Sequence, residues 1–107
     1  MFYKKNEDGY RQMAEGIEMK TLVHGEKTST SEFRIAKGAE IPTHAHPHEQ
    51  TGFMVSGTLR LDVEGQIFDA RAGDSWNIPG NKPHSATALE DTVVVEVFSP
   101  VREEYLP

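Results

Sequence analysis

Residues 38–57, GAEIPTHAHPHEQTGFMVSG, contain three of the five histidines of this 107-residue chain, at positions 44, 46 and 48. Successive side chains of an extended strand point to opposite faces, so His44 and His46 are expected to project from one face. Gln50 has the same parity, and a turn at Pro47 would bring its side chain toward the same point. Two imidazoles and one side-chain carbonyl oxygen form a mixed nitrogen and oxygen set that suits a borderline divalent metal ion.

A fourth ligand is expected from a distant segment. His84 follows the turn-rich residues 73–83, GDSWNIPGNKP, at the start of another predicted strand. A His-x-His pair alone is more simply interpreted as part of a solvated, histidine-rich loop. The complete spacing, with a further histidine after a Gly/Pro turn, favours a metal site instead. His48 lies beyond Pro47 and is expected to remain outside the ligand set.

The two segments resemble the two sequence motifs of the cupins. The first motif is similar to Gly38-x5-His44-x-His46-x3-Gln50-x6-Gly57, and the second to Gly73-x5-Pro79-x4-His84. Three positions depart from the common pattern, which more often has Glu at Gln50, Gly at Asn81 and Asn at Ala88. Asparagine tolerates the left-handed backbone that a glycine would serve. A neutral Gln50 would leave the full positive charge of a dication directed toward a substrate.

Short stretches of alternating apolar and polar residues, separated by turn signals, recur along the chain. The clearest predicted strands are residues 16–23, 28–36, 58–64 and 67–72. Residues 84–89 and 92–98 are expected to form a final hairpin joined at Glu90 and Asp91. Eight or more such strands, with no helical periodicity, predict an all-β barrel or sandwich. The cupin resemblance implies that residues 1–107 form a single-domain jelly-roll barrel with the metal facing its interior.

The composition limits the class of partner. The chain has 17 Asp and Glu against 11 Lys and Arg, a formal net charge of −6, which argues against nucleic acid or an anionic membrane. The absence of cysteine excludes disulfides, zinc–thiolate sites and thiol catalysis. The N-terminal MFYKKNEDGYRQ is too charged for a signal peptide, and no apolar run reaches membrane-spanning length, so a cytoplasmic protein is expected. A hydrophobic content of 36%, together with the cupin resemblance, predicts a homodimer.

Glu96 interrupts the apolar run of residues 93–98 and shares a strand face with Val94 and Phe98. If this face lines the barrel, the carboxylate lies in a poorly solvated cavity, where desolvation favours its neutral form. Such a group can act as a general acid or base. The alternative is that Glu96 faces water at a sheet edge.

The tail, EVFSPVREEYL at residues 96–106, together with HAHPHEQ at residues 44–50, resembles the pectin-degradation cupins of the KdgF type. The resemblance implies one divalent metal ion held by His44, His46, Gln50 and His84. It also implies catalytic roles for Glu96, Phe98 and Arg102, with Glu96 in place of the Asp that is usual there. The implied reaction converts cyclic 4,5-unsaturated uronates, released from pectin or alginate, into the linear keto form.

These residue types suit that chemistry. Arg102 would bind the uronate carboxylate through its planar fork, Glu96 would move protons, and Phe98 would form an apolar wall. Alternatively, Arg102 forms a surface ion pair with Glu103 or Glu104. No redox change is required, and the donors accept nickel, zinc, manganese, iron or copper. Two other functions remain open from the sequence: a metal-dependent cupin dioxygenase and a non-catalytic cupin that binds a small molecule.

Overall fold

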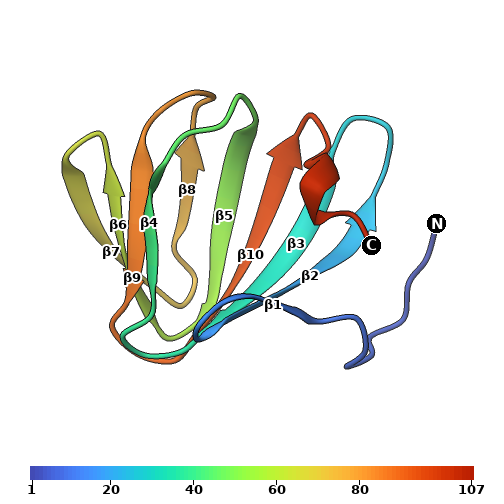
Figure 1. Cartoon of the computed structure of the whole chain (residues 1–107), viewed down its shortest axis with the longest axis horizontal. Coiled ribbons are helices and arrows are strands. Elements are labelled where there is room, and N and C mark those ends of the chain that lie inside the picture. Colours follow the sequence, from blue (N-terminus) through green and yellow to red (C-terminus); the bar gives the residue numbers. More distant parts are fainter.

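The computed structural model describes residues 1–107 as two facing antiparallel β-sheets (Figure 1). The six-stranded sheet has the order β1-β2-β3-β10-β5-β8, and the four-stranded sheet has the order β4-β9-β6-β7. The bounds are β1 Arg11–Ala14, β2 Ile17–His24, β3 Ser29–Ile35, β4 Glu40–His44, β5 Glu49–Ser56, β6 Thr58–Val63, β7 Gln66–Arg71, β8 Ser75–Ile78, β9 His84–Ala88, β10 Thr92–Ser99 and the 3₁₀ turn η1 Glu103–Tyr105. The predicted all-β architecture is therefore confirmed. The single helical turn is too short and too polar to traverse a bilayer.

The predicted final hairpin is wrong. β9 pairs with β4 and β6, whereas β10 pairs with β3 and β5 in the facing sheet. Both strands alternate between buried and more exposed residues, and such alternation specifies the buried face of a strand but not its neighbours. The short link between them crosses from one sheet to the other. As a result His84 on β9 and Glu96 on β10 reach the same interior from opposite walls.

The core lies between the two sheets and is formed by their inward-facing side chains. β3 is the most regular contributor, because every second residue along it is buried. On the opposite wall, Leu59 and Leu61 of β6 are buried as the sequence alternation predicts. Each large apolar side chain buried in this way contributes about 1.5–3 kcal/mol relative to exposure. This packed layer fixes the positions of the strands that carry the polar interior residues.

Two loops meet at the end of the barrel that holds the histidines. The backbone N–H of Asn81, in the loop between β8 and β9, donates to the carbonyl oxygen of His46 over 2.7 Å. Asn81 has φ of +65°, so it occupies the left-handed conformation for which asparagine is suited. At Gly80 a Cβ atom would lie only 2.4 Å from the Pro47 carbonyl oxygen. The second motif thus supports the first through a backbone contact too close for a side chain.

Candidate metal centre

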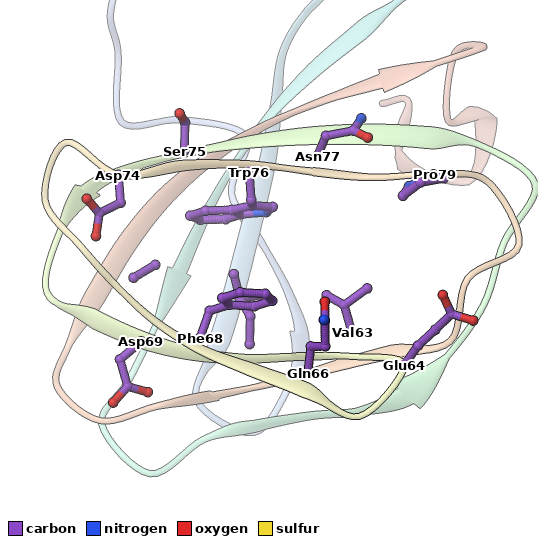
Figure 2. Close-up of a pocket in the computed structure, with 12 residues that line it drawn as sticks. Val63, Glu64, Gln66, Phe68, Asp69, Asp74, Ser75, Trp76, Asn77 and Pro79 are labelled. Carbon is purple, nitrogen blue, oxygen red and sulfur yellow. The ribbon is translucent and has the colours of Figure 1, made fainter.

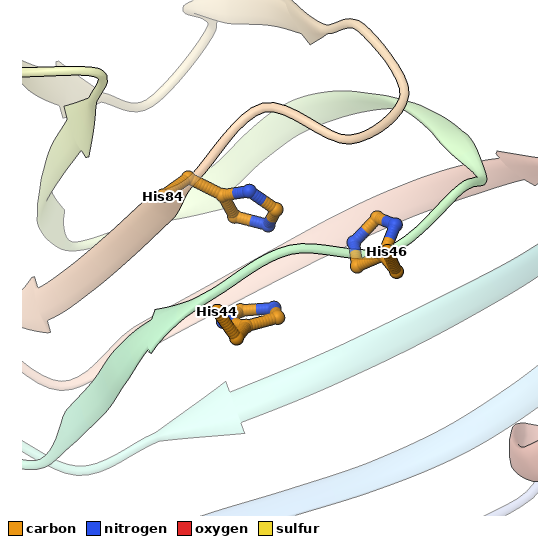
Figure 3. A group of neighbouring side chains, drawn as sticks. All are labelled: His44, His46 and His84. Carbon is orange, nitrogen blue, oxygen red and sulfur yellow. The ribbon is translucent and has the colours of Figure 1, made fainter.

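Three imidazoles converge at the mouth between the sheets (Figure 3). One ring nitrogen from each of His44, His46 and His84 lies within 4.8 Å of the others. His44 is the last residue of β4 and His84 the first of β9, and these two positions are directly paired across the sheet. His46 lies in the loop after β4 and not on the strand itself. The sequence prediction that these three side chains point to a common centre agrees with this geometry.

Each of the three rings is oriented by a backbone carbonyl two residues away. The Nδ1 atoms of His44, His46 and His84 lie 2.9, 3.0 and 2.8 Å from the carbonyl oxygens of Pro42, His48 and Lys82, respectively. A carbonyl oxygen can only accept, so Nδ1 carries the proton in each ring and Nε2 keeps its lone pair. Histidines that bind metals commonly donate their other ring N–H in this way.

Gln50 completes the group from β5. Its Oε1 atom lies 2.7 Å from His46 Nε2, while its Nε2 donates to Glu96 Oε2 over 2.8 Å. With His46 Nδ1 protonated, its Nε2 and the Gln50 oxygen are both acceptors, a pairing that a cation bound between them would satisfy. Burial, reinforced by the charge of Arg102, lowers the pKa of His46 to about 4, which disfavours a second proton on the ring. The three histidines and Gln50 therefore offer a donor set that fits a divalent metal ion.

Behind the histidines lies a cavity of about 50 Å³. Glu96, Phe98 and Arg102, which the sequence singled out, all line this cavity. Burial raises the pKa of Glu96 to about 7, with the positive charge of Arg102 acting in the opposite direction. Phe98 is fully buried, and its ring lies edge-on to His46 with centroids 6.0 Å apart. The inward orientation of Glu96 agrees with the first of the two interpretations of its strand face.

Arg102 is buried, with only 8% of its surface exposed. Its guanidinium carbon lies 4.4 Å from the centroid of the Tyr105 ring and 5.2 Å from that of Phe98. The predicted surface ion pair is present in part, because Arg102 Nε lies 3.2 Å from a Glu104 carboxylate oxygen. The cation is nevertheless held over two aromatic faces at the cavity wall, an arrangement that stabilises a desolvated charge.

Tyr105 is a site residue that the sequence reasoning missed. It lines the same cavity and packs edge-on against Phe98 and Phe33, with centroids 5.6 and 5.8 Å apart. Thr21 Oγ1 on β2 donates to the Tyr105 carbonyl oxygen over 2.5 Å and so holds the tail against the six-stranded sheet. The only signal in the sequence was a single aromatic residue in a charged tail. Tyr105 thereby positions Arg102.

His48 lies outside the histidine cluster, and its ring centroid is 5.6 Å from that of His46. Its peptide carbonyl accepts the His46 Nδ1 proton, so its backbone contributes to the site although its side chain does not join the cluster.

A larger cavity, of about 910 Å³, opens between β7 and β8 (Figure 2). Trp76 and Phe68 face each other across it, and Phe68 remains 52% exposed. The carboxylates there are engaged locally: Asp69 pairs with Arg60 at 2.8 Å, and Asp74 accepts the backbone N–H of Arg71. The latter contact caps the backbone turn between β7 and β8. This cavity has no histidine in its lining, so the ligand chemistry is concentrated in the smaller one.

Comparison with known proteins identifies the family of this chain. The family described as cupin domain matches residues 31–99. The chain is 25% identical to the pectin degradation protein KdgF of Dickeya dadantii (strain 3937) over 107 residues, which are 98% of this chain and 97% of that protein. The solved structure of KdgF from Halomonas sp. has a TM-score of 0.93 at 30% identity, and the match covers 99% of this chain and 100% of the other.

A shorter match relates 83 residues, 73% of this chain, to 22% of the oxalate decarboxylase OxdC of Bacillus subtilis (strain 168), at 30% identity. The full-length matches, by contrast, extend from the first strand to the tail that carries Arg102 and Tyr105. The chain therefore belongs to the cupin family, and it is a small cupin similar over its whole length to the KdgF-type pectin-degradation proteins.

Proposed function

We propose that this protein is a metal-dependent enzyme that converts cyclic 4,5-unsaturated uronates, derived from pectin or alginate, into the linear keto form. One observation carries the proposal: the buried Arg102 and the half-buried Glu96 line the same small cavity as two of the three convergent imidazoles, those of His44 and His84. The full-length similarity to the KdgF proteins supports it. The substrate would be a small anionic sugar acid.

His44, His46, Gln50 and His84 would hold one divalent ion, with nickel, zinc, manganese and iron all compatible with the donors. Such an ion, when bound, supplies Lewis-acid polarisation of a substrate oxygen without any change of oxidation state. The neutral ligands leave its charge uncompensated except through Glu96.

Arg102 would anchor the uronate carboxylate. Stacking on Tyr105 fixes the guanidinium plane, and its two terminal NH₂ groups make no hydrogen bond within the chain. Those donors match the two oxygens of a carboxylate. Glu104 contacts the guanidinium at Nε, 3.2 Å away. Phe98 would form the apolar floor beside the ring.

Glu96 would move the protons of the reaction. It accepts the proton of the anomeric hydroxyl while the bond between the anomeric carbon and the ring oxygen breaks, which leaves an aldehyde and an enolate. Return of the same proton from Glu96 to the former alkene carbon converts the enolate into the ketone. The linear product therefore has the same atoms as the cyclic substrate. A carboxyl group whose pKa is raised to about 7 can both accept and donate at neutral pH.

The test is the ultraviolet absorbance of the unsaturated uronate, which disappears as the conjugated double bond becomes a ketone. Purified, zinc-loaded protein is expected to accelerate this loss well above the spontaneous rate. His84→Ala is expected to abolish the acceleration, and Glu18→Gln, an exposed acid on β2, is the matched control. Equal rates with the wild-type protein, with His84→Ala and with buffer alone would overturn the proposal.

A further inference from the structure

Gln50 has a terminal amide whose two ends differ chemically but not in shape. Its Oε1 atom can only accept and can bind a metal, whereas its Nε2 atom carries two protons and cannot. A half turn of the amide would place the NH₂ group against His46 with almost no change in volume. Because Gln50 is only 4% exposed, hydrogen bonds to water do not favour one orientation of the amide over the other. The metal site therefore requires a group that selects one orientation.

Glu96 makes that selection. Its Oε2 atom accepts the Gln50 Nε2 proton over 2.8 Å, and in its ionised form the carboxylate presents no donor to the opposite end of the amide. With Nε2 directed to Glu96, Oε1 must face His46 Nε2, where it is found at 2.7 Å. The Glu96 side chain makes no other hydrogen bond, so its second oxygen is left for the cavity.

The strand register explains why these two side chains meet. Glu96 on β10 is directly opposite Gly52 on β5, and Gln50 is two residues along the same face. Diagonal pairs of this kind are within reach of long side chains. Gly52 has no side chain of its own, and the Trp76 ring occupies the space where its Cβ would lie. The diagonal Gln50 is thus the residue that Glu96 contacts.

We propose that Glu96 is a positioning residue for the metal site: its carboxylate holds the Gln50 amide with its oxygen toward the histidines. When ionised, it also places one negative charge a single hydrogen bond away from an otherwise neutral donor set. Partners that orient metal ligands in this way commonly affect metal affinity by 10–100-fold. The inference rests on the metal site of the proposed function and is independent of the uronate reaction.

Zinc affinity of the metal-free protein, measured by competition with a chromogenic chelator, tests the inference without any turnover assay. Glu96→Gln keeps the size of the side chain but can face Gln50 with either end of its own amide, so selection is lost. A weakening of about tenfold or more is expected. Glu18→Gln removes an acid of the same type from an exposed position and should leave the affinity unchanged.

Exchanging the two side chains is the decisive control. In the double variant Gln50→Glu/Glu96→Gln, a carboxylate would face the histidines and the new amide would donate to it. A carboxylate needs no selection, since both its oxygens accept. The double variant should therefore bind zinc at least as tightly as the wild type, although Glu96→Gln alone does not. Such non-additivity is expected for residues that are in direct contact, and independent sites would instead give additive effects.

A second readout keeps the test valid if the exchanged variant folds poorly. In ¹⁵N-labelled protein, the Gln50 side-chain NH₂ signals, assigned by their loss in Gln50→Glu, should exchange slowly with water in the wild type and fast in Glu96→Gln. Zinc affinity within about twofold of the wild type for Glu96→Gln, with unchanged NH₂ exchange, would overturn the inference. A protein that binds zinc as expected but does not convert uronates would refute the proposed reaction alone.

Discussion

His44 and His84 are directly opposite each other on β4 and β9, and their ring centroids lie 4.3 Å apart. This pair joins the two cupin motifs, which are far apart in the sequence, into one site. The register of a single strand pair therefore places two of the candidate metal ligands, and the loop after β4 adds His46 beside them.

The histidine cluster predicts which variants lose metal. His84→Ala should reduce bound metal from one ion per chain to a small fraction, because it removes one of the convergent nitrogens. His48→Ala should leave the content near stoichiometric, since the His48 side chain lies outside the histidine cluster and its peptide carbonyl, which accepts from His46, is kept. Elemental analysis of both purified variants checks this. An equal loss in both would mean that the ligand set is assigned wrongly.

Stability of the metal-free protein should depend on pH through His46. Burial lowers its pKa from 6.5 to about 4, so between these values the unfolded chain binds more protons than the folded chain. The stabilising contribution is complete above pH 6.5 and is lost as the pH falls toward 4. Urea unfolding of wild type and His46→Gln from pH 7 to pH 5 should show a smaller decrease for the variant. Parallel curves would contradict the shift.

Glu96 should act on stability in the opposite direction. Burial raises its pKa from 4.5 to about 7, so the folded chain holds the proton more tightly between these values. Its contribution is complete below pH 4.5 and is lost as the pH rises through 7. In metal-free protein, Glu96→Gln should therefore gain stability relative to the wild type as the pH rises from 5 to 8. A constant difference over that range would show that the carboxyl group is not shifted.

Glu96→Gln should also reduce turnover of the unsaturated uronate by roughly a hundredfold or more, the scale expected for a lost general acid or base. The measurement uses saturating zinc, so that weaker metal binding does not contribute. Turnover within threefold of the wild type under these conditions would remove Glu96 from the proton chemistry.

Arg102→Lys should raise KM by about tenfold or more before it changes kcat. The charge is kept, but the planar fork that pairs with both carboxylate oxygens is lost. Steady-state kinetics over a range of substrate concentrations separate the two effects. A fall in kcat at unchanged KM would instead place Arg102 in the chemical step.

A homodimer is predicted through the outer face of the six-stranded sheet. Phe53 and Val55 on β5 are 50% and 48% exposed there, and Val95 of β10 is directly opposite Phe53. Light scattering at micromolar concentration should give the mass of two chains, and Phe53→Glu should shift it toward one. A monomeric wild-type protein would contradict this prediction.

Much of the candidate site could be predicted because local rules determine it. Alternation along β5 directs Gln50 inward, and alternation in residues 92–98 directs Glu96 inward. Other features depend on contacts between distant segments. The partners of β9 and β10 follow from how two sheets enclose a core, and Tyr105 joins the site only because its carbonyl is bound by Thr21. Neither the strand partners nor the contact of Tyr105 can be predicted from a periodic pattern in the sequence.

The contact of each imidazole with a carbonyl two residues away has a consequence for how the site tolerates mutation. All three acceptors are backbone oxygens, of Pro42, His48 and Lys82. A side-chain substitution at any of these positions leaves the acceptor in place as long as the local backbone conformation is kept. The tautomer of each histidine is therefore insensitive to the identity of its neighbours, and the sequence around the ligands is free to vary.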